Sequence, residues 1–133
     1  GCGPEVDMRG LRELGWMCDG VDLLTGVGLN YSYQSENAPY DLVYSNYVIQ
    51  KLVRSKALVF SIAKNLKSGG KFFIHTFEMA DEVAKKRFTE ESLRSLFVDT
   101  ALEIESCRQF KVWDDEPGHM HYHHILEVTG RKR

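Results

Sequence analysis

The chain has 133 residues, of which 43% are hydrophobic and 27% are charged. This balance is typical of one globular domain and excludes a wholly disordered chain, a collagen and a simple coiled coil. With 17 basic and 19 acidic residues, the formal net charge is -2, so no strong cationic field favours extended contact with nucleic acid. We expect residues 1–133 to form a single domain.

The cysteines, at positions 2, 18 and 107, are odd in number and show no Cys-x-x-Cys spacing. This usage argues against a disulfide framework and favours a reducing compartment. Apolar stretches such as residues 57–63 are too short to span a bilayer, and no signal-peptide pattern opens the sequence. We therefore expect a cytoplasmic protein with no membrane partner.

The first third of the chain alternates between a helical pattern and strand patterns. Residues 4–14 predict a helix, with proline in its first turn and Gly15 at its end. Residues 16–24 predict a strand, and residues 29–33 a short second one. Residues 41–46 predict a further strand, which the turn residues before it introduce.

A long helical pattern follows over residues 47–66, with a break predicted near Arg54 and Ser55. A Ser-Gly-Gly turn ends it, and residues 71–77 form an apolar strand pattern. Residues 78–88 contain neither glycine nor proline, and we expect them to be helical or mobile.

The last part of the chain predicts one short helix and a hairpin. Thr89 can cap a helix over residues 90–97. Residues 102–112 and 122–130 read as two strands joined by the turn residues 114–118. Alternation first and a hairpin last indicate an α/β sheet whose final strand is antiparallel.

A glycine turn and a later acid suggest a ligand site. Gly1 and Gly3 precede the first helix, and Asp22 ends the next predicted strand. In nucleotide-binding folds such glycines let the backbone approach the ligand, and an acid about 20 residues later accepts hydrogen bonds from ribose. Val6 replaces the third glycine of a dinucleotide fingerprint, so the turn suits a nucleoside without phosphate. The alternative is an ordinary loop with a solvated carboxylate.

The sequence resembles the class I S-adenosylmethionine-dependent methyltransferases. Four segments carry the resemblance: Gly-Cys-Gly-Pro at 1–4, Gly-Val-Asp-Leu at 20–23, Pro-Tyr-Asp-Leu-Val-Tyr-Ser-Asn-Tyr-Val-Ile at 39–49, and Leu-Lys-Ser-Gly-Gly-Lys-Phe at 66–72. The resemblance implies a Rossmann-like, mostly parallel sheet flanked by helices, with a C-terminal antiparallel hairpin. Residues 88–91 and 119–127 are similar to the small-molecule branch that includes the type 11 and tellurite-resistance-like methyltransferases.

Three departures from the family pattern stand out. No hydrophobic strand precedes Gly1, and Glu5 occupies a position that is usually glycine. Only 18 residues separate Asp22 from Asp41, where the family has a helix and a third strand. Glu36 is the one acid there that could replace the family's adenine-binding acid. We expect the sequence to be a truncated or gapped part of a larger domain.

The resemblance implies S-adenosyl-L-methionine as the cofactor and assigns its contacts. The glycine turn would approach the methionine part, the acid of the second motif would bind ribose, and the third motif would border donor and acceptor. The implied cofactor-binding residues are Gly1, Cys2, Gly3, Asp22, Leu23, Ser45, Asn46 and Tyr47.

Three histidines near the C-terminus are candidates for proton transfer. His119, His121 and His123 alternate, so on a strand they share one face. We expect His119, His121 and Tyr47 to be catalytic. The alternatives are a polar hairpin and, for Tyr47, packing at the start of a helix. No cysteine or acid lies at an obvious ligand spacing, so no metal site is predicted.

The expected function is transfer of a methyl group from a sulfonium to a small-molecule acceptor by in-line displacement (EC 2.1.1.-). Such a reaction depends chiefly on proximity and orientation. Two other functions stay open: a catalytically inactive binding or scaffold module with this fold, and methylation of protein or RNA.

Overall fold

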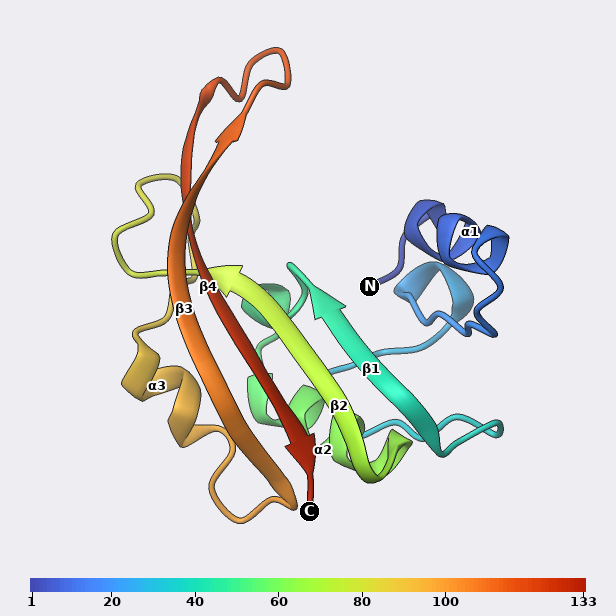
Figure 1. Ribbon diagram of the computed structural model, residues 1–133. Helices are drawn as coiled ribbons and strands as arrows, with labels where there is room; N and C mark the ends of the chain where they lie inside the picture. Colours follow the sequence, from blue (N-terminus) through green and yellow to red (C-terminus); the bar gives the residue numbers. More distant parts are fainter.

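The computed structural model describes all of residues 1–133 (Figure 1). It contains three α-helices, two short 3-10 helices and four strands. In chain order these are α1 Val6–Glu13, η1 Leu23–Thr25, β1 Tyr40–Asn46, η2 Ile49–Lys51, α2 Ser55–Asn65, β2 Leu66–Phe77, α3 Glu90–Ser95, β3 Leu102–Asp114 and β4 His121–Lys132.

The strands form one sheet in the order β1-β2-β4-β3. β1 and β2 are parallel and are connected through α2, whereas β2–β4 and β4–β3 are antiparallel. The α/β fold with a C-terminal antiparallel hairpin is therefore confirmed. We expected a mostly parallel sheet, but only one of the three strand pairings is parallel. The parallel part is smaller because two upstream segments that were predicted as strands do not join the sheet.

One face of the sheet carries the core. Phe72 and Ile74 of β2 point to this face and are almost fully buried together with Val59 and Ile62 of α2. Phe72 also stacks on Phe97, which follows α3, with 5.5 Å between ring centroids. Helices α2 and α3 therefore both lie on this face, and alternate residues of β2 are left for the opposite one.

The predicted strand over residues 16–24 is wrong. Its contact with the N-terminus is a hydrogen bond from the Cys2 N–H to the Val21 carbonyl, and its end forms the 3-10 helix η1. Asp22 caps that turn by accepting from the Leu24 N–H at 3.0 Å. A strand needs a neighbouring strand, and the carboxylate at position 22 favours the capped turn instead.

The predicted short strand over residues 29–33 is also wrong. This segment is held to α2 by side chains: the Tyr33 N–H donates to Ser61 Oγ at 2.9 Å, and Asn65 Nδ2 donates to the Tyr33 carbonyl at 2.8 Å. Because polar side chains of α2 satisfy both backbone groups of Tyr33, this residue needs no partner strand.

The helical predictions hold with adjusted ends. The break near Arg54 is confirmed, since η2 ends at Lys51 and α2 begins at Ser55. Residues 78–88 form turns rather than a helix, closed by a bridge between Glu78 and Phe88. None of the helices combines the length and apolar character needed to cross a bilayer.

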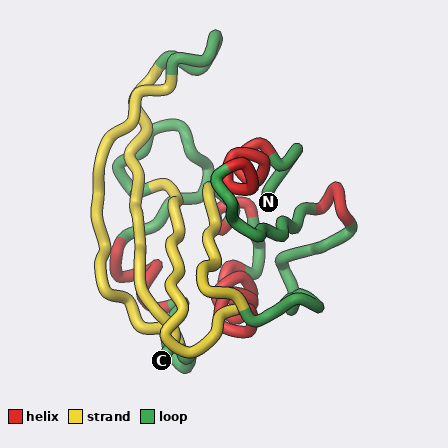
Figure 2. Tube along the Cα trace, turned by 45° about the vertical axis from the view of Figure 1, so that its right-hand side comes forward, coloured by secondary structure: helices red, strands yellow, loops and turns green.

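The N-terminal helix stands apart from the sheet. Figures 1 and 2 show α1 beyond β1, the edge strand whose second side has no strand partner. The carboxyl ends of β1 and β2, residues 78–88 and the tip of the β3–β4 hairpin all lie at one end of the sheet (Figure 1). Open α/β sheets bind their ligands at this end.

Candidate active site

A cavity of about 770 Å³ lies between β1 and the N-terminal part of the chain. One wall comes from β1 and α2, and the other from residues 1–21 and 33–37. Of the expected cofactor-binding residues, Gly1, Cys2, Ser45 and Asn46 line this cavity. Its size is within the usual range of small-molecule sites, about 300–1,000 Å³.

The glycine turn touches the predicted ribose acid directly. The Gly3 N–H donates to Asp22 Oδ2 at 2.9 Å. Hydrogen bonds from the N–H groups of Leu24 and Gly3 lower the pKa of Asp22 below its ordinary value. A carboxylate has about four acceptor positions, so Asp22 keeps capacity for a ligand. Leu23 follows it and is largely exposed.

Glycine suits positions 1 and 3 of the turn for two different structural reasons. A Cβ at Gly1 would lie 2.3 Å from Val48 Cγ2, so a larger residue at this position would require the Val48 side chain to move. Gly3 has a φ of 52°, with nothing within 4 Å of where its Cβ would lie. Glu5 adopts a similar left-handed conformation, φ 62°, so the turn keeps a glycine-like backbone where the family usually has glycine.

Ser45 carries a buried hydroxyl without a partner. The residue is 6% exposed, its Oγ makes no hydrogen bond, and it lines the cavity. Buried polar groups are nearly always hydrogen-bonded. The Ser45 hydroxyl is therefore an unsatisfied polar group in the wall of the cavity.

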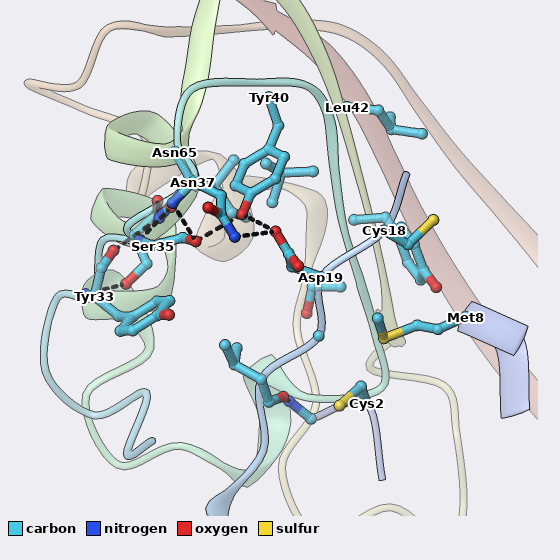
Figure 3. A pocket seen from close by; sticks show the side chains of 18 of the residues that line it. Cys2, Met8, Cys18, Asp19, Tyr33, Ser35, Asn37, Tyr40, Leu42 and Asn65 are labelled. Carbon is cyan, nitrogen blue, oxygen red and sulfur yellow. Dashed lines mark hydrogen bonds between the residues drawn. The ribbon is translucent and has the colours of Figure 1, made fainter. Parts of the chain in front are cut away.

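A polar cluster, formed by residues of this second wall and by Tyr40 of β1, also lines the cavity. Asp19 Oδ2 accepts hydrogen bonds from the Tyr40 hydroxyl and from Asn37 Nδ2, and Ser35 Oγ lies 2.6 Å from the same hydroxyl (Figure 3). These hydrogen bonds lower the pKa of Asp19, whereas burial and the bond to Asp19 raise the pKa of Tyr40. The sequence prediction missed this cluster. Glu36 also lines the cavity, and its adenine role stays a prediction.

Tyr47 and His121 lie on one row of rings at the carboxyl end of the sheet. Ring centroids are 5.3 Å apart for Tyr47–Phe77, 4.9 Å for Phe77–His123 and 4.3 Å for His123–His121. His121 Nε2 is buried and has no hydrogen-bond partner. Two of the three residues predicted to be catalytic are thus connected through side-chain packing.

His119 is outside this row. It lies in the hairpin turn, its side chain is 63% exposed, and its closest acid is Glu116 at 3.8 Å. The alternation at 119, 121 and 123 predicted one shared face, but the strand begins only at His121. The structure therefore separates His119 from the other two histidines.

The sequence prediction also missed Asp81, which is fully buried. Its carboxylate accepts from the N–H groups of Val83, Ala84 and His124 and from His123 Nδ1 at 3.0 Å. Burial opposes its ionisation, but these hydrogen bonds outweigh burial and lower the pKa to about 2. Aspartate often stabilises a turn by accepting hydrogen bonds from the backbone N–H groups that follow it. This tendency could have indicated a turn-forming role for Asp81 from the sequence.

The family assignment comes from comparison with known proteins. A family model described as a methyltransferase domain matches residues 1–129. No curated protein is similar enough in sequence to count as a relative.

Solved structures share the fold at low sequence identity. One is described as "Conversion of a Disulfide Bond into a Thioacetal Group during Echinomycin Biosynthesis" (TM-score 0.74, 16% identity, 99% of this chain and 72% of that chain). Another is the N-methyltransferase NodS from Bradyrhizobium japonicum WM9 in complex with S-adenosyl-L-homocysteine (0.60, 17%, 98% and 63%). A third is 1,6-didemethyltoxoflavin-N1-methyltransferase from Burkholderia thailandensis, bound to that methyltransferase's substrate and S-adenosylhomocysteine (0.55, 21%, 74% and 46%).

These likenesses agree with the strand order, the parallel β1–β2 pair and the antiparallel C-terminal strands. The chain spans less than two thirds of the length of NodS and of the Burkholderia enzyme. It belongs to the methyltransferase-domain family and has the class I methyltransferase fold, in which S-adenosylmethionine is the methyl donor.

Proposed function

We propose that this chain transfers the methyl group of S-adenosylmethionine to a small-molecule acceptor. The observation that carries the proposal is the contact between the Gly3 N–H and the Asp22 carboxylate. Through this contact the glycine turn lies against Asp22, the acid that we propose binds ribose, next to a cavity that Gly1 and Cys2 line.

The residues present fit this donor. The space beside Gly3 is open, Asp22 keeps acceptor positions for ribose hydroxyls, and Ser45 has a buried hydroxyl without a partner. We assign the methionine part to the glycine turn and ribose to Asp22 with Leu23. The residues after β1 would border donor and acceptor: Ser45, Asn46 and Tyr47.

The donor's sulfonium supplies an already activated methyl group. The protein then has to hold the donor and the acceptor in line, because this proximity and orientation lower the activation barrier of methyl transfer. A base is needed only where the acceptor must lose a proton. We assign that role to His121, whose Nε2 is buried without a partner and whose ring follows Tyr47, Phe77 and His123 in one row. His119 lies at the exposed hairpin tip, and a catalytic role for it stays a prediction.

Three observations support a small acceptor. The Burkholderia enzyme, which shares the fold, is a methyltransferase with 1,6-didemethyltoxoflavin bound. The formal charge of -2 offers no field for a nucleic-acid partner, and the cavity is of small-molecule size.

A second candidate function is binding or another reaction without methyl transfer. The [4+2]-cyclase SpnF has the same fold (TM-score 0.54, 11% identity, 80% of this chain and 54% of that chain). The fold therefore serves chemistry other than methyl transfer.

A transfer assay with donor labelled in its methyl group distinguishes the two functions. The chain would be incubated with labelled S-adenosylmethionine and a panel of small amines, thiols and phenols. Label recovered in an acceptor, and lost when Asp22 is replaced by alanine, supports methyl transfer. Donor binding without transfer across the panel favours the second function.

A further inference from the structure

Four side chains form a row across the sheet, one from each strand. Asn46 of β1 is in register with His75 of β2, which is in register with Glu127 of β4, which is in register with Arg108 of β3. Each neighbouring pair is also in hydrogen-bonding contact: 3.0 Å from His75 Nδ1 to Asn46 Oδ1, 2.5 Å from His75 Nε2 to Glu127 Oε2, and 2.8 Å from Arg108 Nε to Glu127 Oε1.

The acid in this row is ionised and held from both sides. The Glu127 side chain is 16% exposed, and that of His75 is 22% exposed. Burial opposes ionisation of Glu127, but hydrogen bonds from His75 and Arg108 outweigh it and lower the pKa of the carboxyl. His75 Nε2 therefore carries a hydrogen and donates a hydrogen bond to Glu127 whether the ring is neutral or charged.

The surroundings of His75 leave its other nitrogen, Nδ1, for Asn46. The rings of Phe73 and Phe110 lie 5.4 and 5.9 Å from its ring. The titratable and charged groups around it are Glu127 on β4, Arg108 on β3 beyond that carboxylate, and Tyr47 after β1, whose ring is 6.1 Å away. Burial raises the pKa of Tyr47, so this phenol stays neutral at ordinary pH.

This arrangement couples the charge of His75 to the orientation of the Asn46 amide. A neutral ring accepts at Nδ1, so the amide must turn its NH₂ toward His75 and its carbonyl away. A charged ring donates from Nδ1, so the carbonyl faces His75 and the NH₂ faces away. Asn46 lines the cavity, and an amide that turns over exchanges the positions of its carbonyl and NH₂ groups.

We propose that His75 is a positioning residue: held by Glu127, it sets whether Asn46 presents a hydrogen-bond acceptor or a donor to the ligand in the cavity. The identity of that ligand as the methyl donor rests on the proposed function. The coupling between His75 and Asn46 does not, because it is a property of the sheet alone.

Nuclear magnetic resonance of the Asn46 side-chain amide, measured on the whole chain from pH 5 to pH 8, tests the coupling. The amide signals are assigned by their loss in Asn46→Ser. In the unmodified chain we expect them to shift with the same midpoint as the His75 ring signals. His75→Phe keeps an aromatic ring without nitrogen atoms and should abolish the shift, and Glu127→Gln should reduce it by at least half. Glu105→Gln, which removes an exposed carboxylate paired with Lys71 on the same sheet, should leave it unchanged.

Two results separate this inference from the proposed function. Asn46 signals that do not respond to pH, or that respond equally in His75→Phe, would overturn the coupling. Addition of S-adenosylhomocysteine should also move the Asn46 signals. A chain that does not bind this probe, by calorimetry, contradicts the proposed function and leaves the coupling intact. A chain that binds the probe without any change in the Asn46 signals contradicts the positioning role.

Discussion

The Gly3 N–H donates to a carboxylate oxygen of Asp22 at 2.9 Å, although the two residues are 19 positions apart. This contact brings the glycine turn of the first motif against the acid of the second. It forms without the strand that was predicted over residues 16–24, because the 3-10 turn η1 presents the same carboxylate. The local geometry for a nucleoside ligand therefore depends on the turn and its cap.

Replacing Asp22 by alanine is expected to weaken S-adenosylhomocysteine binding by at least about tenfold, since charge-assisted hydrogen bonds to ribose are lost. Calorimetric titration measures this directly. Glu103→Gln is a suitable control, because Glu103 is an exposed acid on β3 that pairs with Arg131 and does not line the cavity. Equal affinity in Asp22→Ala and the unmodified chain would refute the ribose assignment.

Ser45→Ala is expected to have opposite effects on stability and on binding. Removing a buried hydroxyl without a partner should leave the melting temperature unchanged or higher, whereas binding of S-adenosylhomocysteine should weaken by roughly 3- to 10-fold. Thermal melting and calorimetry on the same sample provide both values.

The matched control is Ser55→Ala. The Ser55 hydroxyl is buried but fully engaged, with the Ile49 and Leu52 carbonyls and with Lys86 Nζ. Its loss should lower the free energy of unfolding by about 1–3 kcal/mol without changing ligand affinity. Ser45→Ala that destabilises the chain as much as Ser55→Ala would show that the Ser45 hydroxyl has a structural partner.

Asp81 should make the free energy of unfolding depend on pH in the acidic range. Its folded pKa of about 2 lies below the ordinary value of 3.8, so its contribution is present above about pH 4 and is lost as pH falls toward 2. Asp81→Asn should lower the free energy of unfolding by about 2 kcal/mol at pH 7, and the difference should shrink between pH 4 and pH 2. Urea unfolding at several pH values measures this.

Glu82→Gln is the control for Asp81, because Glu82 is its exposed neighbour. Hydrogen exchange at the Val83 and Ala84 amides should accelerate in Asp81→Ala, which removes the acceptor of both N–H groups, and should stay unchanged in Glu82→Gln. Exchange that is unaffected would contradict the turn-forming role of this acid.

The two candidate histidines should differ in their effect on turnover. With an acceptor that must lose a proton, His121→Gln should lower kcat by about 10²- to 10⁴-fold, the usual contribution of a general base. His119→Gln should have a smaller effect, because His119 is exposed at the hairpin tip. The pH dependence of kcat should flatten only in His121→Gln. Equal losses in both variants would contradict the assignment of the base to His121.

Local sequence signals predicted the parts of the fold that depend on local chemistry. The break before Ser55, the cap at Thr89 and the final hairpin are all found, because capping residues and turn residues act within a few positions. The predicted strand over residues 29–33 fails because Ser61 and Asn65, about 30 positions later, bind its backbone instead.

The site was predictable only where a motif spans short distances. Gly3 and Asp22 lie only 19 positions apart and are in contact, and their role in ligand binding stays a prediction. His75 and Glu127 are 52 positions apart and meet only because β2 and β4 pair in one register. The same holds for Asp81 and His123, which are 42 positions apart. No spacing rule in one sequence encodes such a register.

In the proposed site, the turn at Gly1–Gly3 binds the methionine part of a methyl donor and the carboxylate of Asp22 binds its ribose. Calorimetric titration of the unmodified chain with S-adenosylhomocysteine should then show saturable binding with one site per chain. A folded chain that shows no saturable heat and no shift in melting temperature with this ligand would contradict it.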